Sequence, residues 1–253
     1  QNLAQVLEDR PGITIEEGVA GGKTLRMCGI DAKYVLVLLD GAPIAGKFNN
    51  RQELHLINSN QIDHIEIVKG PSSALYGSEA MGGVINVITK GVTENFSLEA
   101  QGKTGSFDLY NGSARVAGRT NEFSYSLNLD HTRGGIDKNE ISINVTDTQA
   151  SHVGGKLTFD QNKWGRYEIG LNYNFDQQHG QDPIFRTGTD VNRNDGYLSW
   201  KKAFAKKFEF SSRFFGTDNK REYTEIVRHS GNIARVDETS EIIWGVKNDA
   251  SYH

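Results

Sequence analysis

Residues 62–90 read IDHIEIVKGPSSALYGSEAMGGVINVITK, and this stretch decides the fold of the first third of the chain. It begins with an aliphatic, β-branched run at 62–68 and ends with another at 84–88, and such runs favour strands. Gly70-Pro71 stops the first run, and Gly82-Gly83 lets the backbone reverse before the second. Ser72 or Ser73 offers an N-cap for a short helix between them. The stretch therefore predicts a strand, a short helix and a second strand.

The residues before this stretch predict further short elements of both kinds. An amphipathic pattern predicts a helix over about 1–9, which ends before Pro11 because proline disfavours helix for the residue that precedes it. Strands are predicted over 13–15, 24–27 and 34–39. The apolar run at 34–39 indicates a strand buried on both faces, and Asp40-Gly41 after it predicts a tight turn. Residues 1–90 thus have a mixed α and β pattern.

From about residue 95 the pattern changes to strict alternation of apolar and polar residues, as in 123–130 and 167–176. Similar segments lie near 96–104, 108–117, 152–160, 195–204, 207–217 and 240–252. Short links at 117–122 and 160–165 alternate with long polar stretches at 131–150, 176–194 and 217–239, which we expect to be loops. A period of two, with short turns on one side and long loops on the other, is typical of an outer-membrane β-barrel.

The number of alternating segments limits the architecture. Eight or nine strands would close a barrel whose interior is filled by its own side chains, with no room for residues 1–90. The segments therefore belong to a much larger barrel, or they form a soluble sheet.

Composition and motifs exclude several other classes. A net charge of -4, from 28 basic and 32 acidic residues, gives no electrostatic attraction to nucleic acid. The single cysteine, Cys28, excludes an intramolecular disulfide and a multi-cysteine metal site. The seven histidines lack the paired spacing of a metal site, and no nucleophile elbow is present. We therefore predict no catalytic residue, no metal site and no cofactor, and we do not expect an enzyme.

Three blocks of the first 90 residues resemble the plug domain of TonB-dependent outer-membrane receptors. They are Leu3–Gly12, Gly29-Ile30-Asp31 together with Tyr34–Gly41, and above all Ile62–Lys90. Cys28 departs from the family pattern, because many members have Arg or Gln before this glycine. The alternating remainder is similar to the family's barrel only in its pattern.

The resemblance implies a fold and a division of the chain. We expect a transmembrane β-barrel, partial and antiparallel, with an N-terminal α+β plug domain. The plug would cover residues 1–90, and the first barrel strands would cover 91–253. Because the family's barrel has about 22 strands around a plugged lumen, we expect the chain to be a piece of a longer protein, truncated at both ends.

The resemblance also implies a function in the bacterial outer membrane. The protein would be an active transporter for a scarce ligand, an iron–siderophore or related metal chelate, with haem or cobalamin as the alternative. Its partners would be TonB, acting on a segment expected before Gln1, the chelate ligand, and outer-membrane lipid, but not nucleic acid. A soluble or surface β-sheet binding protein without transport activity is the alternative from another class, and it requires the apolar strand faces to pack against a second sheet.

The expected ligand-facing residues lie in the plug loop after Asp40-Gly41 and in the loop Glu16–Lys23. They are Lys47, Phe48, Asn49, Asn50 and Arg51, where a basic and aromatic pair suits an anionic iron chelate or a porphyrin. A second group is expected to serve plug architecture: Asp40, Gly41, Gly70, Pro71, Tyr76, Gly77, Gly82 and Gly83. His131, His179 and His229 fall in or beside predicted outer loops, where they would contact a haem-like ligand or simply be solvated.

Overall fold

The computed structural model describes residues 3–8, 10–17, 23–44, 47–48, 51–52, 54, 57, 59–70, 80–106, 108–135, 147–161, 163–181, 184–205 and 208–252. The N-terminal elements are α1 (Leu3–Glu8), β1 (Ile13–Glu17), β2 (Lys23–Met27), the short 3-10 helix η2 (Ala32–Tyr34), β3 (Val35–Leu39), β4 (Ala42–Pro43), β5 (Lys47–Phe48), β6 (Arg51–Gln52), η4 (Ser59–Gln61), β7 (Ile62–Lys69) and β8 (Gly83–Thr89). No helix within the described ranges has the length and apolar character needed to cross a membrane.

A four-stranded sheet in the order β4-β3-β8-β7 is the centre of the N-terminal part, called the N-terminal sheet below. β3 and β8 are parallel, whereas β7 and β8 are antiparallel. All five residues of β3 are buried, which confirms the prediction of a strand covered on both faces. Leu3 and Leu7 of α1 join Val37 and Ile85 in the hydrophobic core, so the helix predicted near the N-terminus covers one side of this sheet.

The predicted turn at Asp40-Gly41 joins β3 to β4. Leu39 pairs with Ala42, so the hairpin loop has two residues. Both have positive φ, 49° at Asp40 and 82° at Gly41. Positive φ at both central positions is what a type I′ hairpin turn requires, and Asp-Gly is a favoured pair for it.

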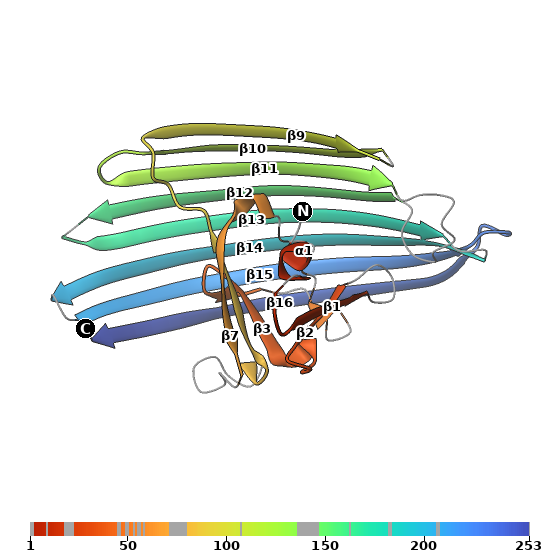
Figure 1. The fold of residues 1–253 in the computed structure, drawn as a ribbon, viewed down its shortest axis with the longest axis horizontal. Coiled ribbons are helices and arrows are strands. Elements are labelled where there is room, and N and C mark those ends of the chain that lie inside the picture. The colour runs from red at the N-terminus through yellow and green to blue at the C-terminus, as the bar shows by residue number, and fades with distance from the viewer. Residues whose placement is uncertain are drawn as a thin grey trace.

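The rest of the chain forms one antiparallel sheet of eight strands, from β9 to β16 in sequence order, called the long-strand sheet below. Its strands are β9 (Phe96–Gly105), β10 (Leu109–Arg119), β11 (Phe123–Gly135), β12 (Asp147–Gln161), β13 (Gly165–Gln181), β14 (Phe185–Ala205), β15 (Phe208–Val227) and β16 (Ile233–Tyr252). Figure 1 shows this curved layer with the N-terminal sheet lying against one of its faces. We call that face the inner face.

The two faces of the long-strand sheet differ in chemistry. Facing residues of adjacent strands point to the same side of a sheet, and one such level is large and apolar from β9 to β16 except for Gly118 of β10. It consists of Phe96, Tyr125, Leu157, Ile169, Leu198, Phe214 and Val246. Apart from Tyr125, these side chains remain 45% to 64% exposed. The soluble alternative requires these side chains to pack against a second sheet, and they do not. They match the lipid-facing band of a membrane barrel instead.

The predicted long loops are wrong for two of the three polar stretches. The sheet continues through most of 176–194, as β13 and β14, and through most of 217–239, as β15 and β16. The strands therefore reach 17 to 21 residues in β13 to β16. A barrel strand needs an apolar face only where it meets lipid. The alternation of apolar and polar residues therefore stops before the strand and its hydrogen bonds to the neighbouring strands end.

Candidate functional site

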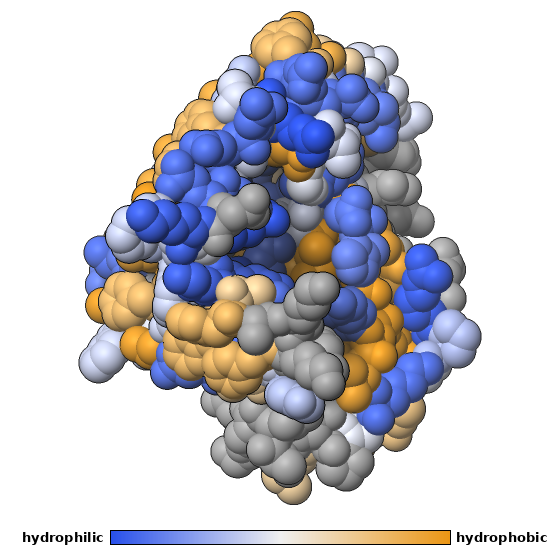
Figure 2. Space-filling model, turned by 90° about the vertical axis from the view of Figure 1, so that its left-hand side faces the viewer, coloured by the Kyte–Doolittle hydropathy of each residue, from blue (hydrophilic) through white to orange (hydrophobic). Residues whose placement is uncertain are grey.

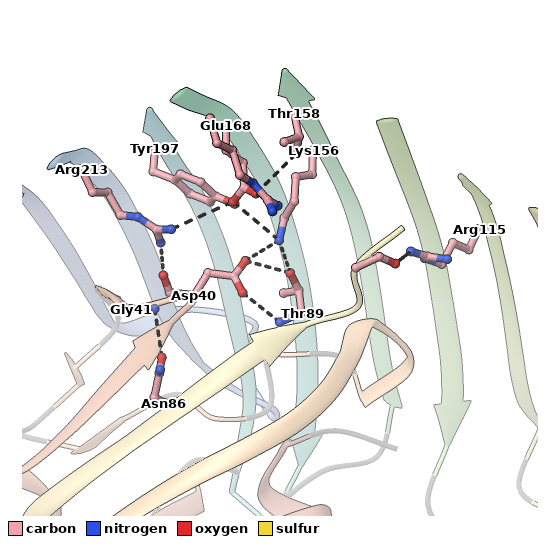
Figure 3. Close-up of polar contacts among 12 residues, drawn as sticks. Asp40, Gly41, Asn86, Thr89, Arg115, Lys156, Thr158, Glu168, Tyr197 and Arg213 are labelled. Atoms are coloured by element: carbon pink, nitrogen blue, oxygen red, sulfur yellow. Dashed lines mark hydrogen bonds and ion pairs between the residues drawn. The ribbon is translucent and has the colours of Figure 1, made fainter. Parts of the chain in front are cut away.

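Two sheets meet at a group of charged and hydroxyl side chains, shown in Figure 3 and called the ion-pair cluster below. Its members are Asp40, Thr89, Lys156, Glu168, Tyr197 and Arg213. From β12, the Lys156 ammonium lies 2.9 Å from Asp40 Oδ2 and donates to Thr89 Oγ1 at 2.6 Å. Thr89 in turn donates to Asp40, from its hydroxyl at 2.7 Å and from its backbone N–H at 2.9 Å. The ends of β3 and β8 are thus bound to one residue of the long-strand sheet.

The second half of the cluster lies entirely on the long-strand sheet. Glu168 of β13 accepts a hydrogen bond from the Tyr197 hydroxyl at 2.7 Å. Its other carboxylate oxygen lies 3.1 Å from Arg166 Nη2. Arg213 of β15 lies over the Tyr197 ring, 4.3 Å from its centroid, and donates to the backbone carbonyl of Asp40. The Asp40 turn therefore contacts both β12 and β15.

The local backbone presents Asp40 to this wall. β3 ends at Leu39, and the left-handed conformation of the next two residues turns the chain away from the buried sheet. Asn86 of β8 supports the turn, because its side-chain oxygen accepts the Gly41 N–H at 2.9 Å. The Asp40 N–H is also satisfied, by the Val87 carbonyl at 2.8 Å. The carboxylate is therefore held in a fixed direction.

The electrostatics of Asp40 follow from its neighbours. Burial disfavours the charged carboxylate and by itself raises the pKa of Asp40. The Lys156 ammonium and the two hydrogen bonds from Thr89 stabilise the charged form and outweigh burial, so the pKa of Asp40 lies below its ordinary value. Asp40 and Lys156 thus form a charged, largely buried pair, and loss of either partner leaves the other uncompensated.

This arrangement fits a mechanical contact rather than a reactive centre. The cluster joins the two sheets by charge-assisted hydrogen bonds, which are stronger than neutral ones but can be broken and remade. No group of three or more metal-ligating side chains occurs among the described residues. The cluster therefore holds the N-terminal sheet against the long-strand sheet.

The predicted ligand-facing residues form a small hairpin whose tip lies outside the described residues. β5 and β6 pair antiparallel, with Lys47 opposite Gln52 and Phe48 opposite Arg51. Phe48 and Arg51 are thus backbone partners across this hairpin, and their contact with a ligand stays a prediction. Asn49, Asn50 and most of the loop Glu16–Lys23 lie outside the described residues.

The structure describes only some of the residues that were predicted to serve plug architecture. A Cβ added to Gly83 would lie 2.4 Å from the Val68 carbonyl oxygen, and one added to Gly82 would lie 2.9 Å from the Ile30 side chain. Gly70 has a φ of 93°, which favours glycine. Gly82 and Gly83 thus permit close packing at the N-terminal sheet, whereas at Gly70 nothing lies within 4 Å of a Cβ and only the backbone conformation favours glycine. Pro71, Tyr76 and Gly77 fall outside the described part of the chain.

Three histidines considered from the sequence lie away from the inner face. His131 and His179 are strand residues of β11 and β13, on levels that alternate with the buried polar levels. His229 lies in the turn between β15 and β16. A fourth histidine, His152, lies on the inner face and is 5% exposed.

Sequence reasoning missed Lys156, Glu168, Tyr197 and Arg213. Each occupies an inner-face position of an alternating strand, where it looked like an ordinary polar or aromatic residue. A weak signal was present, because a charged residue between two apolar residues, as in Tyr167-Glu168-Ile169, points into the lumen of a barrel. Which plug residue it meets does not follow from the sequence.

Comparison with known proteins finds relatives of this chain. Residues 1–84 match the model of the TonB-dependent receptor plug domain family. The ferric enterobactin receptor of Pseudomonas aeruginosa is 24% identical over 234 residues, which cover 84% of this chain and 28% of that protein. The vitamin B12 transporter BtuB of Photobacterium profundum is 31% identical over 135 residues, covering 53% of this chain and 22% of the transporter. The chain thus spans about a quarter of the length of these relatives.

Solved structures show the same fold for the whole chain. The copper transporter OprC superposes with a TM-score of 0.83 at 12% identity, covering 100% of this chain and 40% of OprC. The siderophore receptor PiuA of Acinetobacter baumannii superposes with a TM-score of 0.77 at 15% identity, covering 98% of this chain and 40% of PiuA. Both matches include the long-strand sheet as well as the N-terminal sheet.

The fold is therefore a partial antiparallel transmembrane β-barrel with an N-terminal α+β plug. Residues 1–84 carry the plug domain of the TonB-dependent receptors, and the chain is similar to receptors of this class from the bacterial outer membrane. The N-terminal sheet is part of the plug, and the long-strand sheet is part of the barrel wall.

Proposed function

We propose that this chain is the plug and part of the barrel wall of an active transporter that takes up an iron–siderophore or related metal chelate. The division into a plug over 1–90 and barrel strands over 91–253 is part of this proposal. The observation that carries it is the ion-pair cluster, in which a plug turn is bound to the barrel wall by contacts that can be released. A transporter needs such a contact, whereas a purely structural membrane sheet does not.

The ligand class is supported by the names of the relatives. A ferric enterobactin receptor matches over 84% of the chain, and an iron-regulated outer-membrane virulence protein of Vibrio cholerae is 25% identical over 83% of the chain. Cobalamin is the second candidate, because the BtuB match has a higher identity over its shorter span. Haem is the other alternative that the sequence left open, but none of these three relatives is named as a haem receptor.

In this proposal, TonB supplies the mechanical work that moves the plug. It would pull on the chain ahead of the plug, weaken the contacts of the ion-pair cluster and let the plug move. Ligand binding would favour the plug state that engages TonB, and it can do so only through a higher affinity for that state. The protein then binds and moves its ligand without changing it chemically, so no enzyme activity is expected.

The test is uptake by cells that lack their own siderophore and cobalamin receptors. The complete gene that encodes this chain is expressed there, and uptake of radioiron-labelled ferric enterobactin is compared with uptake of radiolabelled cobalamin. We expect uptake of the iron chelate, and its loss when TonB is deleted. Uptake of cobalamin alone would move the ligand to the second candidate, and TonB-independent uptake would contradict the transport mechanism.

The predicted ligand residues are tested in the same cells. A Phe48→Ala/Arg51→Ala double variant should bind less chelate at the cell surface while its abundance in the outer membrane stays unchanged. A Lys33→Ala variant is the matched control, because Lys33 is an exposed plug cation next to β3. Unchanged chelate binding by the double variant would remove Lys47, Phe48, Asn49, Asn50 and Arg51 from the proposed binding surface.

A further inference from the structure

The outer face of the barrel wall, which points away from the plug, carries almost no charge toward the end with the short turns. From the level of Leu157 to that end, the described residues of β12 to β16 that face outward are apolar, aromatic or uncharged polar, with the single exception of Lys202 on β14. Figure 2 views this end and shows apolar residues along the outer edge of the wall. Lys202 is thus a lone cation on a face that otherwise suits lipid.

Aromatic side chains surround this lysine. Lys202 lies opposite Phe210 of β15, and its ammonium is 5.3 Å from the centroid of the Phe204 ring, within reach of a cation–π contact. The Trp200 ring packs against Phe204 and Phe210, with centroids 6.2 Å and 6.0 Å away. Aromatic rings of this kind gather where a membrane meets water, and a lysine among them keeps its ammonium at the polar side. The group therefore lies at the level of the lipid headgroups.

The turn between β12 and β13 is fixed against the same part of β14. The Lys202 ammonium donates to the backbone carbonyl of Lys163 at 2.9 Å, and the Trp200 indole N–H donates to that of Trp164 at 2.9 Å. Gly165 has a φ of 89°, and a Cβ there would lie 2.5 Å from a backbone carbonyl oxygen of β14. The Lys163 ammonium in turn lies 5.3 Å from the centroid of the Trp164 ring. Two cations and several aromatic rings are thus held together at one turn.

The two cations of this turn have no acidic partner. Neither Lys163 nor Lys202 forms an ion pair with a carboxylate in the part of the chain that the structure describes. Lys201, the next residue along the chain, points to the inner face instead and lies 2.8 Å from Glu209. An ammonium has three donors, and the carbonyl of the turn uses one of those on Lys202. Two donors and an unpaired charge remain for an anion.

We propose that the β12–β13 turn and Lys202 form a binding site for the headgroup of an anionic phospholipid, such as phosphatidylglycerol, in the membrane leaflet on the side of the short turns. Lys163 and Lys202 bind the phosphate, as basic groups at a membrane surface do. Exposed Trp164 and Phe204 contact the glycerol and the upper acyl chains. The aromatic half of the site selects a lipid over a soluble anion. The site does not depend on which ligand the receptor transports.

The first test measures lipid binding to the complete receptor in detergent. Native mass spectrometry follows the phosphatidylglycerol or phosphatidylethanolamine that stays bound during a titration. Lys202→Gln should lower the affinity for phosphatidylglycerol about fivefold, the effect of one basic residue near an anionic membrane surface. It should leave the affinity for phosphatidylethanolamine unchanged, and Lys202→Arg should bind like the wild type. Lys201→Gln is the matched control, because it removes a cation from the inner face, and it should also bind normally.

Four outcomes of this test overturn the site. Equal affinities of the wild-type receptor for the two lipids would show no selectivity for the anionic headgroup. Unchanged binding by Lys202→Gln would remove that lysine from the site. An equal loss in Lys202→Gln and Lys201→Gln would show a general effect of net charge. Displacement of the lipid by an equal concentration of glycerol phosphate would show that the ligand is a soluble anion.

The second test locates the lipid in native outer membranes and changes neither lysine. Trp164 or Tyr252 is replaced by the photoreactive p-benzoylphenylalanine, since both are exposed aromatic residues at the same end of the sheet. The ratio of crosslinked phosphatidylglycerol to crosslinked phosphatidylethanolamine should be at least about fivefold higher at position 164. Equal ratios at the two positions would overturn the site. Neither test involves transport, so failure of the site leaves the proposed function as it stands.

Discussion

Lys156 binds two plug residues that lie 116 and 67 positions away in the chain, Asp40 and Thr89. Its side chain is 19% exposed and that of Asp40 is 9% exposed, so the pair is largely removed from water. The net stability of such a pair is small, because desolvation offsets much of the Coulomb attraction. Removal of one partner is costly, since it leaves a buried charge alone.

Lys156→Met should therefore destabilise the contact between plug and wall. We expect a loss of about 3 kcal/mol in the free energy of unfolding, at the low end of the range for broken buried ion pairs. Thermal unfolding of the detergent-solubilised full-length receptor measures it. Lys103→Met is the control, because Lys103 is an exposed residue on the inner face of β9. Equal losses in both variants would contradict a specific role for Lys156.

The lowered pKa of Asp40 makes this contact dependent on pH. A carboxylate whose pKa is lower in the folded state adds stability above its unfolded pKa, and that stability is lost as the pH falls through the folded pKa. We expect the receptor to lose stability below about pH 4, the ordinary aspartate range, and Asp40→Asn to lose less over that range. Unfolding midpoints measured against pH test this, with exposed Asp160→Asn as the control. Parallel curves for wild type and Asp40→Asn would show that Asp40 does not contribute.

At the scale of the element, β8 is placed so that its first residue tolerates no side chain. Gly83 has a φ of 139°, and a Cβ there would lie 2.4 Å from the Val68 carbonyl and 2.5 Å from Met27 Sδ. Gly83→Ala should cost about 3 kcal/mol of plug stability, from backbone strain and overpacking together. Gly91→Ala is the control, since nothing lies within 4 Å of a Cβ there. Similar unfolding midpoints for the two variants would exclude this packing role.

The types of these elements were predictable from the sequence, but their lengths and partners were not. The run at 34–39 and the alternation at 123–130 gave strands that the structure confirms as β3 and β11. The strands β13 to β16 are longer than predicted, because alternation marks only the part of a strand that meets lipid. Asp40 was predicted as a turn residue, which it is. Its contact with Lys156 depends on register across the sheet, which no local pattern encodes.

At the scale of the whole molecule, the outer face of the barrel wall is an interface with lipid. Leu171 on β13 is 64% exposed and faces away from the plug. Leu171→Arg should cost about 2–4 kcal/mol, as for an arginine near the middle of the bilayer. Gln177→Arg, on the same strand and face but beyond the apolar band, should cost about 0–1 kcal/mol. Urea titration of the receptor folded into lipid vesicles compares them, and equal costs would contradict this membrane orientation.

The parallel pairing of β3 with β8 also determines how the plug responds to force. β1 and β2 form a separate two-stranded antiparallel sheet. Tension applied at α1 therefore opens their residue pairs one after another, beginning with Ile13 and Met27. Tension that reaches Val35 instead runs along β3, whose far end and that of β8 are both fixed at Lys156. All five pairs from Val35 to Leu39 then share the load in shear. The N-terminal hairpin thus extends under weak tension, and the central strands yield only under a much stronger one.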